Sequence, residues 1–218
     1  MNIIKSAVDI DNKKIVYDGC MVTYNGVIVN LFEPDPNDIL LTDIAHGLAF
    51  TCRWNGHTKT YFSVAEHCCM MHDLVPDDLK LTALFHDCEE AYWGDIIKPL
   101  KNLLPLEIRN KMESFRAMIF EKFGVKEICK EVDKCDFQML QWDLDNLILP
   151  PITHVGMTCY NAEIEWLKRA TNLLPKEQDR YSSRKLLKPE VFRYLLSIGI
   201  DLFDLIESGL AINKTTLP

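Results

Sequence analysis

The chain has 218 residues, of which 48% are hydrophobic and 26% are charged, and its formal net charge is -8. This length and composition suffice for one domain with a buried core, and they exclude a disordered chain. The negative charge argues against an obligate nucleic-acid partner, because a phosphate backbone attracts basic surfaces. A free nucleotide is still compatible, since a bound cation and a few basic side chains can reverse the local field.

The chain contains eight cysteines, and no two of them form a Cys-x-x-Cys pair. The first residues lack the apolar stretch of a secretory leader, and no apolar run is long enough to span a bilayer. We therefore expect a cytoplasmic protein without a membrane partner, in which the thiols are free and mostly buried as small hydrophobic side chains.

The N-terminal part of the sequence predicts a small β-hairpin followed by helices. Residues 14–31 are rich in Val, Ile and Tyr and contain the turn-forming step Tyr24-Asn25-Gly26. The pattern becomes helical from Thr42 onward. Ser63 and Glu66 have the spacing of a capping box, which predicts that a helix begins there.

The later helices are predicted from apolar residues at helical spacing and from Pro and Gly at the ends. A break at Pro150-Pro151 divides this part of the chain. The predicted ranges are 77–94, 105–123, about 126–146, 160–172, 189–197 and 201–209. The predicted fold is all-α, a helical bundle with a small N-terminal β-hairpin, in one domain over residues 1–218 with a C-terminal helical extension at 158–218.

Four side chains on three predicted helices form a candidate metal site. His67 lies in the first turn of one helix, His86 and Asp87 are adjacent on the next, and Asp136 lies on a later one. Two imidazoles and two carboxylates suit Zn, Co, Mn or Fe. Each residue alone has an ordinary structural interpretation, since a single His in a helix is more often a core or surface residue.

Further polar residues surround this candidate site in the sequence. Glu90 shares a helix face with His86, and Asp95 follows the predicted helix end, so either carboxylate can orient a water or exchange its proton. Lys98 and Arg53 can bind phosphate oxygens, and Trp54 offers a flat surface to a sugar or base.

The remaining histidines divide into two groups. His46 and His57 are candidates to line the site, and we interpret His72 and His154 as structural.

The ordered combination of motifs is more specific than any single residue. It runs from Asp43-Ile44-Ala45-His46 and Cys52-Arg53-Trp54-Asn55-Gly56-His57 through His67, His86-Asp87-Cys88-Glu89-Glu90 and Gly94-Asp95 to Lys98-Pro99-Leu100-Lys101. This order resembles the HD-domain phosphohydrolases over about residues 34–145. It is most similar to the branch with bacterial deoxynucleoside 5′-monophosphatases and phage dATP triphosphohydrolases.

The resemblance implies a role for each matching residue. The implied metal ligands are His67, His86, Asp87 and Asp136, the implied catalytic acids and bases are Glu90 and Asp95, and the implied substrate contacts are Arg53, Trp54, Lys98 and His57. Asp133 is the alternative to Asp136 as the last ligand. Trp54 is the candidate to sense a missing 2′-hydroxyl group.

The resemblance also implies an activity and its requirements. We expect hydrolysis of a deoxynucleotide, either a triphosphate such as dATP to deoxynucleoside and tripolyphosphate, or a monophosphate to deoxynucleoside and phosphate. One divalent ion per site is expected, Zn, Co or Mn, with Mg a candidate second ion. A homo-oligomer, dimer or hexamer, is expected.

Two alternatives remain open at this point. The first is an HD phosphohydrolase of another phosphoester, such as a cyclic nucleotide or a guanosine alarmone. The second is a non-catalytic HD regulatory module, whose C-terminal extension would leave room for a partner.

Overall fold

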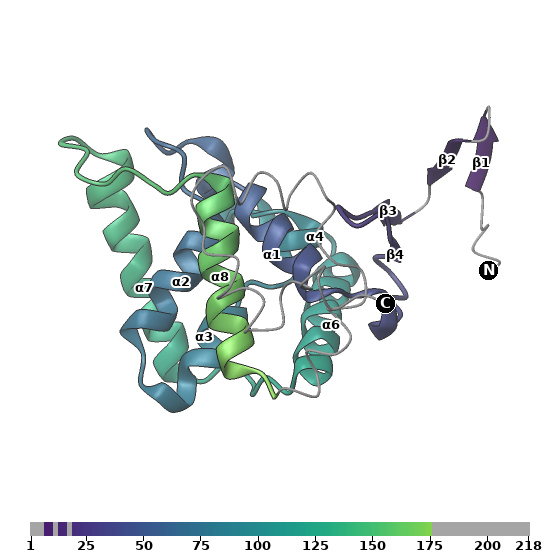
Figure 1. Ribbon diagram of the computed structural model, residues 1–218. Helices are drawn as coiled ribbons and strands as arrows, with labels where there is room; N and C mark the ends of the chain where they lie inside the picture. The colour runs from purple at the N-terminus through teal and green to yellow at the C-terminus, as the bar shows by residue number, and fades with distance from the viewer. Residues whose placement is uncertain (1–6, 11–12, 17–18, 176–218) are drawn as a thin grey trace, which may run out of the picture. The chain divides into compact units, whose positions relative to one another are not determined.

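The computed structural model describes residues 7–10, 13–16 and 19–175 (Figure 1). The described helices belong to one compact unit, Met1–Leu173. The helices predicted at 189–197 and 201–209 lie outside the described residues, so the single domain and the full C-terminal extension stay predictions.

Two antiparallel hairpins precede the helices: β1 (Ala7–Ile10) pairs with β2 (Lys13–Val16), and β3 (Cys20–Val22) pairs with β4 (Ile28–Asn30). The second hairpin is the predicted one, and Gly26 in its turn has a φ of 77°. Asn25 donates its side-chain amide to Asp43 Oδ1 at 2.7 Å, which ties this turn to the first helix. The first hairpin was not predicted, because four-residue strands are too short to show a clear period of two.

The rest of the described chain is mostly helical, which confirms the predicted all-α fold with a small hairpin. The helices are α1 (Leu41–Phe50), α2 (Val64–Leu74), α3 (Lys80–Phe85), α4 (Glu90–Trp93), α5 (Lys98–Lys101), α6 (Leu106–Phe123), α7 (Lys130–Asp143) and α8 (Cys159–Leu173). Short turns of tighter or wider helix are η1 (Pro36–Asp38), η2 (Arg53–Gly56), η3 (Asp77–Leu79) and η4 (Leu144–Ile148). Of the helices within the described ranges, none combines the length and apolarity that crossing a membrane requires.

Helix α2 is the central element of the bundle. It contacts α1, α3, α7 and α8, and Figure 1 shows it beside α7 and α8. Every residue from Val64 to Cys69 is buried, so this part of α2 has no solvent face. Trp166 of α8 is also fully buried and donates its indole N–H to the carbonyl oxygen of Leu84 at 3.1 Å. A side chain in the first turns of α2 is therefore held by packing from several helices.

The N-terminus of α2 has half of the predicted capping box. Ser63 Oγ accepts a hydrogen bond from the Glu66 backbone N–H at 3.1 Å. The Glu66 side chain does not complete the box by accepting a hydrogen bond from the Ser63 backbone N–H. Its carboxylate binds His154 Nε2 at 2.9 Å and the Met157 backbone N–H at 2.7 Å. The buried Glu66 thus ties the loop before α8 to α2, which gives His154 the structural role that was predicted.

Replacing Ser63 with Ala is expected to lower the free energy of unfolding by about 1 kcal/mol, because the buried cap of α2 would lose its acceptor. Urea unfolding followed by circular dichroism measures this change. The matched control is Ser114→Ala on α6, where the exposed hydroxyl donates to the Asn110 carbonyl and has no other partner in the described part of the chain. An equal loss in both variants would contradict the capping role.

Two predicted helices have different bounds in the structure. The helix predicted over 77–94 is interrupted, because Cys88 N–H binds the Phe85 carbonyl and Glu90 N–H binds the Asp87 carbonyl, both at 2.9 Å. These bonds span three residues and tighten the chain into a turn at 86–89 between α3 and α4. The helix predicted from about 126 begins only at Lys130. His86 and Asp87 consequently lie in a turn and not within a helix.

Candidate functional site

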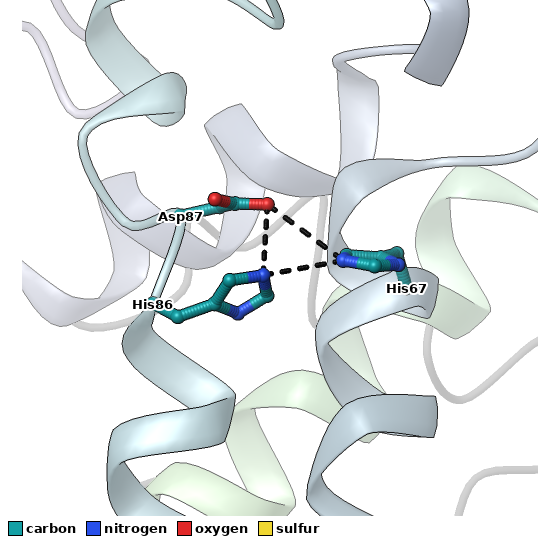
Figure 2. Close-up of side chains that lie close together, drawn as sticks. All are labelled: His67, His86 and Asp87. Atoms are coloured by element: carbon teal, nitrogen blue, oxygen red, sulfur yellow. Dashed lines mark hydrogen bonds and ion pairs between the residues drawn. The ribbon is translucent and has the colours of Figure 1, made fainter. Parts of the chain in front are cut away.

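Three side chains converge at the point where α2 meets the 86–89 turn (Figure 2). His67 Nε2 lies 3.2 Å from His86 Nε2, and Asp87 Oδ2 lies 3.0 Å from His86 Nε2 and 3.8 Å from His67 Nε2. Both imidazoles are buried. These distances give one buried spot where two nitrogens and one carboxylate oxygen meet, and such a group can hold a metal ion.

The orientation of the His86 ring is fixed by a hydrogen bond from Nδ1, the ring nitrogen that does not face His67. Its Nδ1 lies 2.8 Å from the carbonyl oxygen of Ala83, which can only accept, so Nδ1 carries the proton. The lone pair of Nε2 then points toward His67 when the ring is neutral. A backbone partner of this kind is the usual support of a metal-binding histidine.

Asp136 approaches the same spot from α7. Its Oδ1 lies 3.2 Å from His67 Nε2 and 3.8 Å from His86 Nε2. Its side chain is 46% exposed, so it stands on the open side of the buried group. The alternative, Asp133, is exposed, and its side chain makes no hydrogen bond or ion pair with any residue that the structure describes. The geometry therefore brings Asp136 and not Asp133 to the histidines.

The electrostatics of the group suit a cation. Burial and the neighbouring Arg53 lower the pKa of His67. Burial disfavours the charge on Asp87 and Asp136, but the two histidines outweigh it and hold the pKa of both carboxyls well below the usual range. Burial acts to lower the pKa of His86 as well, yet Asp87 and other neighbours raise it well above its ordinary value. The metal-free spot therefore holds a neutral His67, two ionised carboxylates and a His86 ring whose raised pKa favours the protonated form. A metal ion would replace the proton on His86 Nε2.

Glu90 and Asp95 form a second pair of carboxyls beside this group. Glu90 is buried, and its Oε2 has no hydrogen-bond partner among the described residues. Burial, with the charges of Asp87 and Asp95, raises the pKa of Glu90 well above its ordinary value. Burial also raises the pKa of Asp95, although Arg53 opposes it. Carboxyls with raised pKa values can give and take protons near neutral pH.

The short turn η2 carries two of the four predicted substrate contacts, Arg53 and Trp54. The Arg53 guanidinium donates from Nε to Asp143 Oδ2 at 3.1 Å, and its Nη1 lies 3.7 Å from Asp87 Oδ2. Trp54 donates its indole N–H to the same Asp143 Oδ2 at 3.0 Å and its backbone N–H to Asp95 Oδ2 at 2.8 Å. Trp54 has a φ of 56° and Asn55 a φ of 52°, a left-handed conformation that costs energy in residues other than glycine.

Asp143 is the site residue that the sequence did not reveal. It lies seven residues after Asp136, so the two carboxylates share a face of α7. That spacing was the available signal. It was weak, because no motif includes Asp143 and the neighbouring carboxylate of Asp145 looks equivalent in sequence.

A pocket of about 400 Å³ opens beside η2. Its lining combines apolar side chains with a few polar groups: Thr51, Cys52, Asn55, Gly56, Trp93, Gly94, Asp95 and Ile96. This volume falls within the range of sites for small molecules. Asp95 lines the pocket and also binds the backbone of Trp54, so it joins the pocket to the turn that carries Arg53.

Comparison with known proteins finds relatives but no family. No protein-family model matches the chain. YfdR of Escherichia coli K12 is 38% identical over 106 residues, which are 49% of this chain and 59% of YfdR. RCAP_rcc00048 of Rhodobacter capsulatus is 34% identical over 113 residues, 48% of this chain and 58% of that protein. The chain thus spans less than two thirds of either relative, and both are named only as uncharacterized proteins.

Three predicted contact residues do not join the group of histidines and carboxylates. Lys98 on α5 and His57 after η2 are exposed, and their side chains make no hydrogen bond or ion pair within the described part of the chain. His46 stacks between Tyr24 and Phe50, with ring centroids 3.8 and 4.2 Å away, and binds Glu163 Oε2 at 3.1 Å. His46 therefore links α1 to α8 instead of lining the candidate site.

All eight cysteines are free in the structure, as predicted. Four of them are buried, including Cys68 and Cys88 next to the candidate site. Burial raises the pKa of both thiols, which keeps them protonated and unreactive. They fill the core beside the histidines as small apolar side chains.

Proposed function

We propose that the protein is a metal-dependent phosphohydrolase of the HD type that cleaves a deoxynucleotide. The observation that carries this proposal is the convergence of His67, His86 and Asp87 on one buried spot, with Asp136 Oδ1 3.2 Å from His67 Nε2 and 3.8 Å from His86 Nε2. The two carboxyls with raised pKa values and the buried Arg53 beside this spot support hydrolysis rather than metal storage.

The four converging side chains would hold one divalent ion. Two nitrogens and two oxygens suit Zn, Co or Mn, while Mg prefers oxygen alone and would bind as a second ion. A bound ion of this kind lowers the pKa of a water molecule and offsets negative charge on a phosphate oxygen. The orienting bond from His86 Nδ1 to Ala83 and the burial of His67 are the features of this chain that fit such an ion.

The other residues of the site would bind the phosphate and handle protons. Arg53 keeps its charge at every relevant pH and faces Asp87, so it would neutralise charge on the transferred phosphoryl group. Asp95 would orient the attacking water. Glu90, whose raised pKa favours the protonated form, would give its proton to the 5′-oxygen when the bond between that oxygen and the α-phosphorus breaks. The products would be a deoxynucleoside and either phosphate or tripolyphosphate.

The substrate class is proposed from the motifs and from the pocket. The deoxynucleotide, with dATP favoured, follows from the resemblance of the Arg53-Trp54 turn to the deoxynucleotide branch. The pocket beside Asp95 has room for a small-molecule substrate. A cytoplasmic homo-oligomer, dimer or hexamer, completes the proposal.

Product analysis tests the proposed function. The purified protein is incubated with each deoxynucleoside mono-, di- and triphosphate and the matching ribonucleotides, in the presence of Mn, Co, Zn or Mg. Chromatography then resolves nucleoside, phosphate and tripolyphosphate. Release of deoxynucleoside is the expected result. Faster turnover of cyclic or ribonucleotides would favour another phosphoester, and no turnover with any metal would favour a non-catalytic module.

The choice between Asp136 and Asp133 as the fourth ligand can be tested directly. Asp136→Asn is expected to weaken Mn affinity by at least about tenfold, because one anionic ligand is lost. Asp133→Asn is the matched control on the same helix, and it should leave the affinity unchanged. Isothermal titration of metal-free protein with Mn measures both. Weakening in Asp133→Asn alone would assign the ligand to Asp133.

A further inference from the structure

Asp143 is a buried carboxylate to which the proposed mechanism assigns no role. It is fully buried at the end of α7. One of its two oxygens, Oδ2, accepts hydrogen bonds from Arg53 Nε at 3.1 Å and from the Trp54 indole N–H at 3.0 Å, and it forms an ion pair with Arg53 Nη2 at 3.1 Å. A charge-assisted contact of this kind is stronger and more directional than a neutral hydrogen bond. One carboxylate oxygen therefore fixes the directions of two neighbouring side chains.

We propose that Asp143 is the positioning residue of this site, which aims Arg53 at the substrate phosphate and holds the Trp54 ring beside it. This inference rests on the proposed function, because it assigns Arg53 to a phosphate. It adds a residue on α7 to the machinery, outside every motif in the sequence.

One nitrogen of the Arg53 guanidinium is not bound to Asp143 and can contact a ligand. Asp143 occupies Nε and Nη2, and the remaining nitrogen, Nη1, lies 3.7 Å from Asp87 Oδ2. That distance is longer than a hydrogen bond, so Nη1 faces the candidate metal ligand without being bound tightly to it. A phosphate oxygen next to an ion on Asp87 would lie within reach of this nitrogen. Without Asp143, the long Arg53 side chain could turn to Asp87 instead.

The backbone of η2 requires the same support. Trp54 and Asn55 are left-handed, with φ of 56° and 52°, and Gly56 follows with a φ of 82°. Asp143 holds the Trp54 ring, and Asp95 holds the Trp54 backbone N–H. Strained conformations persist only where surrounding contacts determine them, and they concentrate at functional sites.

The unpaired oxygen of Asp143 argues against a purely structural ion pair. Asp143 Oδ1 is buried and has no hydrogen-bond partner among the residues that the structure describes. An ion pair formed only for stability would satisfy both oxygens, since an unsatisfied buried acceptor costs free energy. All described side-chain contacts of this carboxylate are to Arg53 and Trp54. Such an arrangement is expected where the positions of these two side chains matter more than the stability of the fold.

The test measures phosphate affinity and catalysis in matched variants. Asp143→Asn keeps the shape but removes the charge that holds Arg53. We expect it to weaken binding of inorganic phosphate to the Mn-loaded protein by at least about tenfold, and to lower kcat/KM by about 10²-fold, the cost of misplacing a substrate-binding group. The bound Mn per chain should stay unchanged. The control Asp145→Asn alters an exposed carboxylate two residues away, which binds only Gln141, and should behave as wild type.

A double-mutant cycle separates positioning from structure. If Asp143 acts through Arg53, adding Asp143→Asn to Arg53→Lys should cost little further kcat/KM, because the aimed guanidinium is already gone. Independent, multiplying losses in the double variant would overturn the proposal. Asp143→Glu preserves the buried charge if Asp143→Asn does not fold, and its longer side chain should still displace Arg53 and weaken phosphate binding. Wild-type phosphate affinity in Asp143→Glu and Asp143→Asn would equally overturn it.

Phosphate titration also keeps this inference distinct from the proposed hydrolysis. If the wild type binds phosphate but hydrolyses no nucleotide, the proposed function fails while Asp143 is still tested by the titration. If nucleotides are hydrolysed but Asp143→Asn leaves phosphate affinity and kcat/KM unchanged, the Asp143 inference alone fails. If the Mn-loaded wild type neither binds phosphate nor hydrolyses a nucleotide, both are wrong.

Discussion

Asp87→Ala is expected to remove both the bound metal and the activity. Metal content should fall from about one ion per chain to background, and kcat/KM should fall by at least about 10³-fold, because a bound ion contributes several kcal/mol to the reaction barrier. The large expected losses of metal and activity follow from the position and the charge of Asp87. It is the anionic member of the buried group, 3.0 Å from His86 Nε2, and the remaining imidazoles carry no negative charge to offset a cation.

The loss of Asp87 also leaves positive charge without a partner. Arg53 Nη1 lies 3.7 Å from Asp87 Oδ2, and the pKa of His86 is raised chiefly by Asp87 against the effect of burial. In Asp87→Ala the pKa of His86 should fall, since burial then dominates and favours the neutral ring. The fold should survive, because the packing around α2 does not depend on this carboxylate.

Elemental analysis after dialysis, product chromatography and circular dichroism measure these effects together. Asp78→Ala is the matched control, because Asp78 is an exposed carboxylate in η3 with no hydrogen bond or ion pair to other residues in the described ranges. It should keep wild-type metal content and turnover. Full metal content and full activity in Asp87→Ala would show that the ion, or the catalytic centre, lies elsewhere.

The sequence predicted those parts of the fold and site that local patterns determine. Helix α6 begins after Pro105 and ends at Gly124, which has a φ of 67°, as its end signals indicated. His67, His86 and Asp87 were predicted from their order in the motifs, and the structure brings them within hydrogen-bond or ion-pair distance. Their side chains are positioned by α2 and the turn after α3, where apolar spacing and the Ser63 cap are readable in the sequence.

The parts that were not predicted depend on contacts between distant residues. The contacts of Asp143 depend on the left-handed backbone at Trp54 and Asn55. Residue type does not predict a positive φ at these two positions, since only Gly56 of this turn is a glycine. Lys98 illustrates that a residue close to a site in sequence need not contact it in the fold. It closely follows Asp95 in sequence, but α5 leaves its side chain in solvent without a described partner.

Glu90→Gln should lower kcat by about 10²- to 10⁴-fold while metal content is retained, because general acid catalysis contributes about that factor. The amide keeps the size of the side chain but cannot give a proton. The wild-type rate should fall as pH rises through the raised pKa of Glu90, where the acid loses its proton, and this alkaline limb should be absent from the residual activity of Glu90→Gln. The exposed Glu113→Gln on α6 is the control and should keep the wild-type profile.

Glu90 also makes a prediction about stability that does not involve turnover. Its folded pKa lies above its unfolded value, so the folded state holds a proton that the unfolded state releases. The resulting stability is fully present below the unfolded pKa and is lost as pH rises through the folded pKa. In metal-free protein, Glu90→Gln should therefore gain in Tm relative to wild type as pH rises from the ordinary glutamate pKa through the raised pKa of folded Glu90, because the amide does not ionise. A Tm difference that stays constant over this range would mean that Glu90 is ionised in the folded protein, and it could not then be the acid that protonates the leaving oxygen.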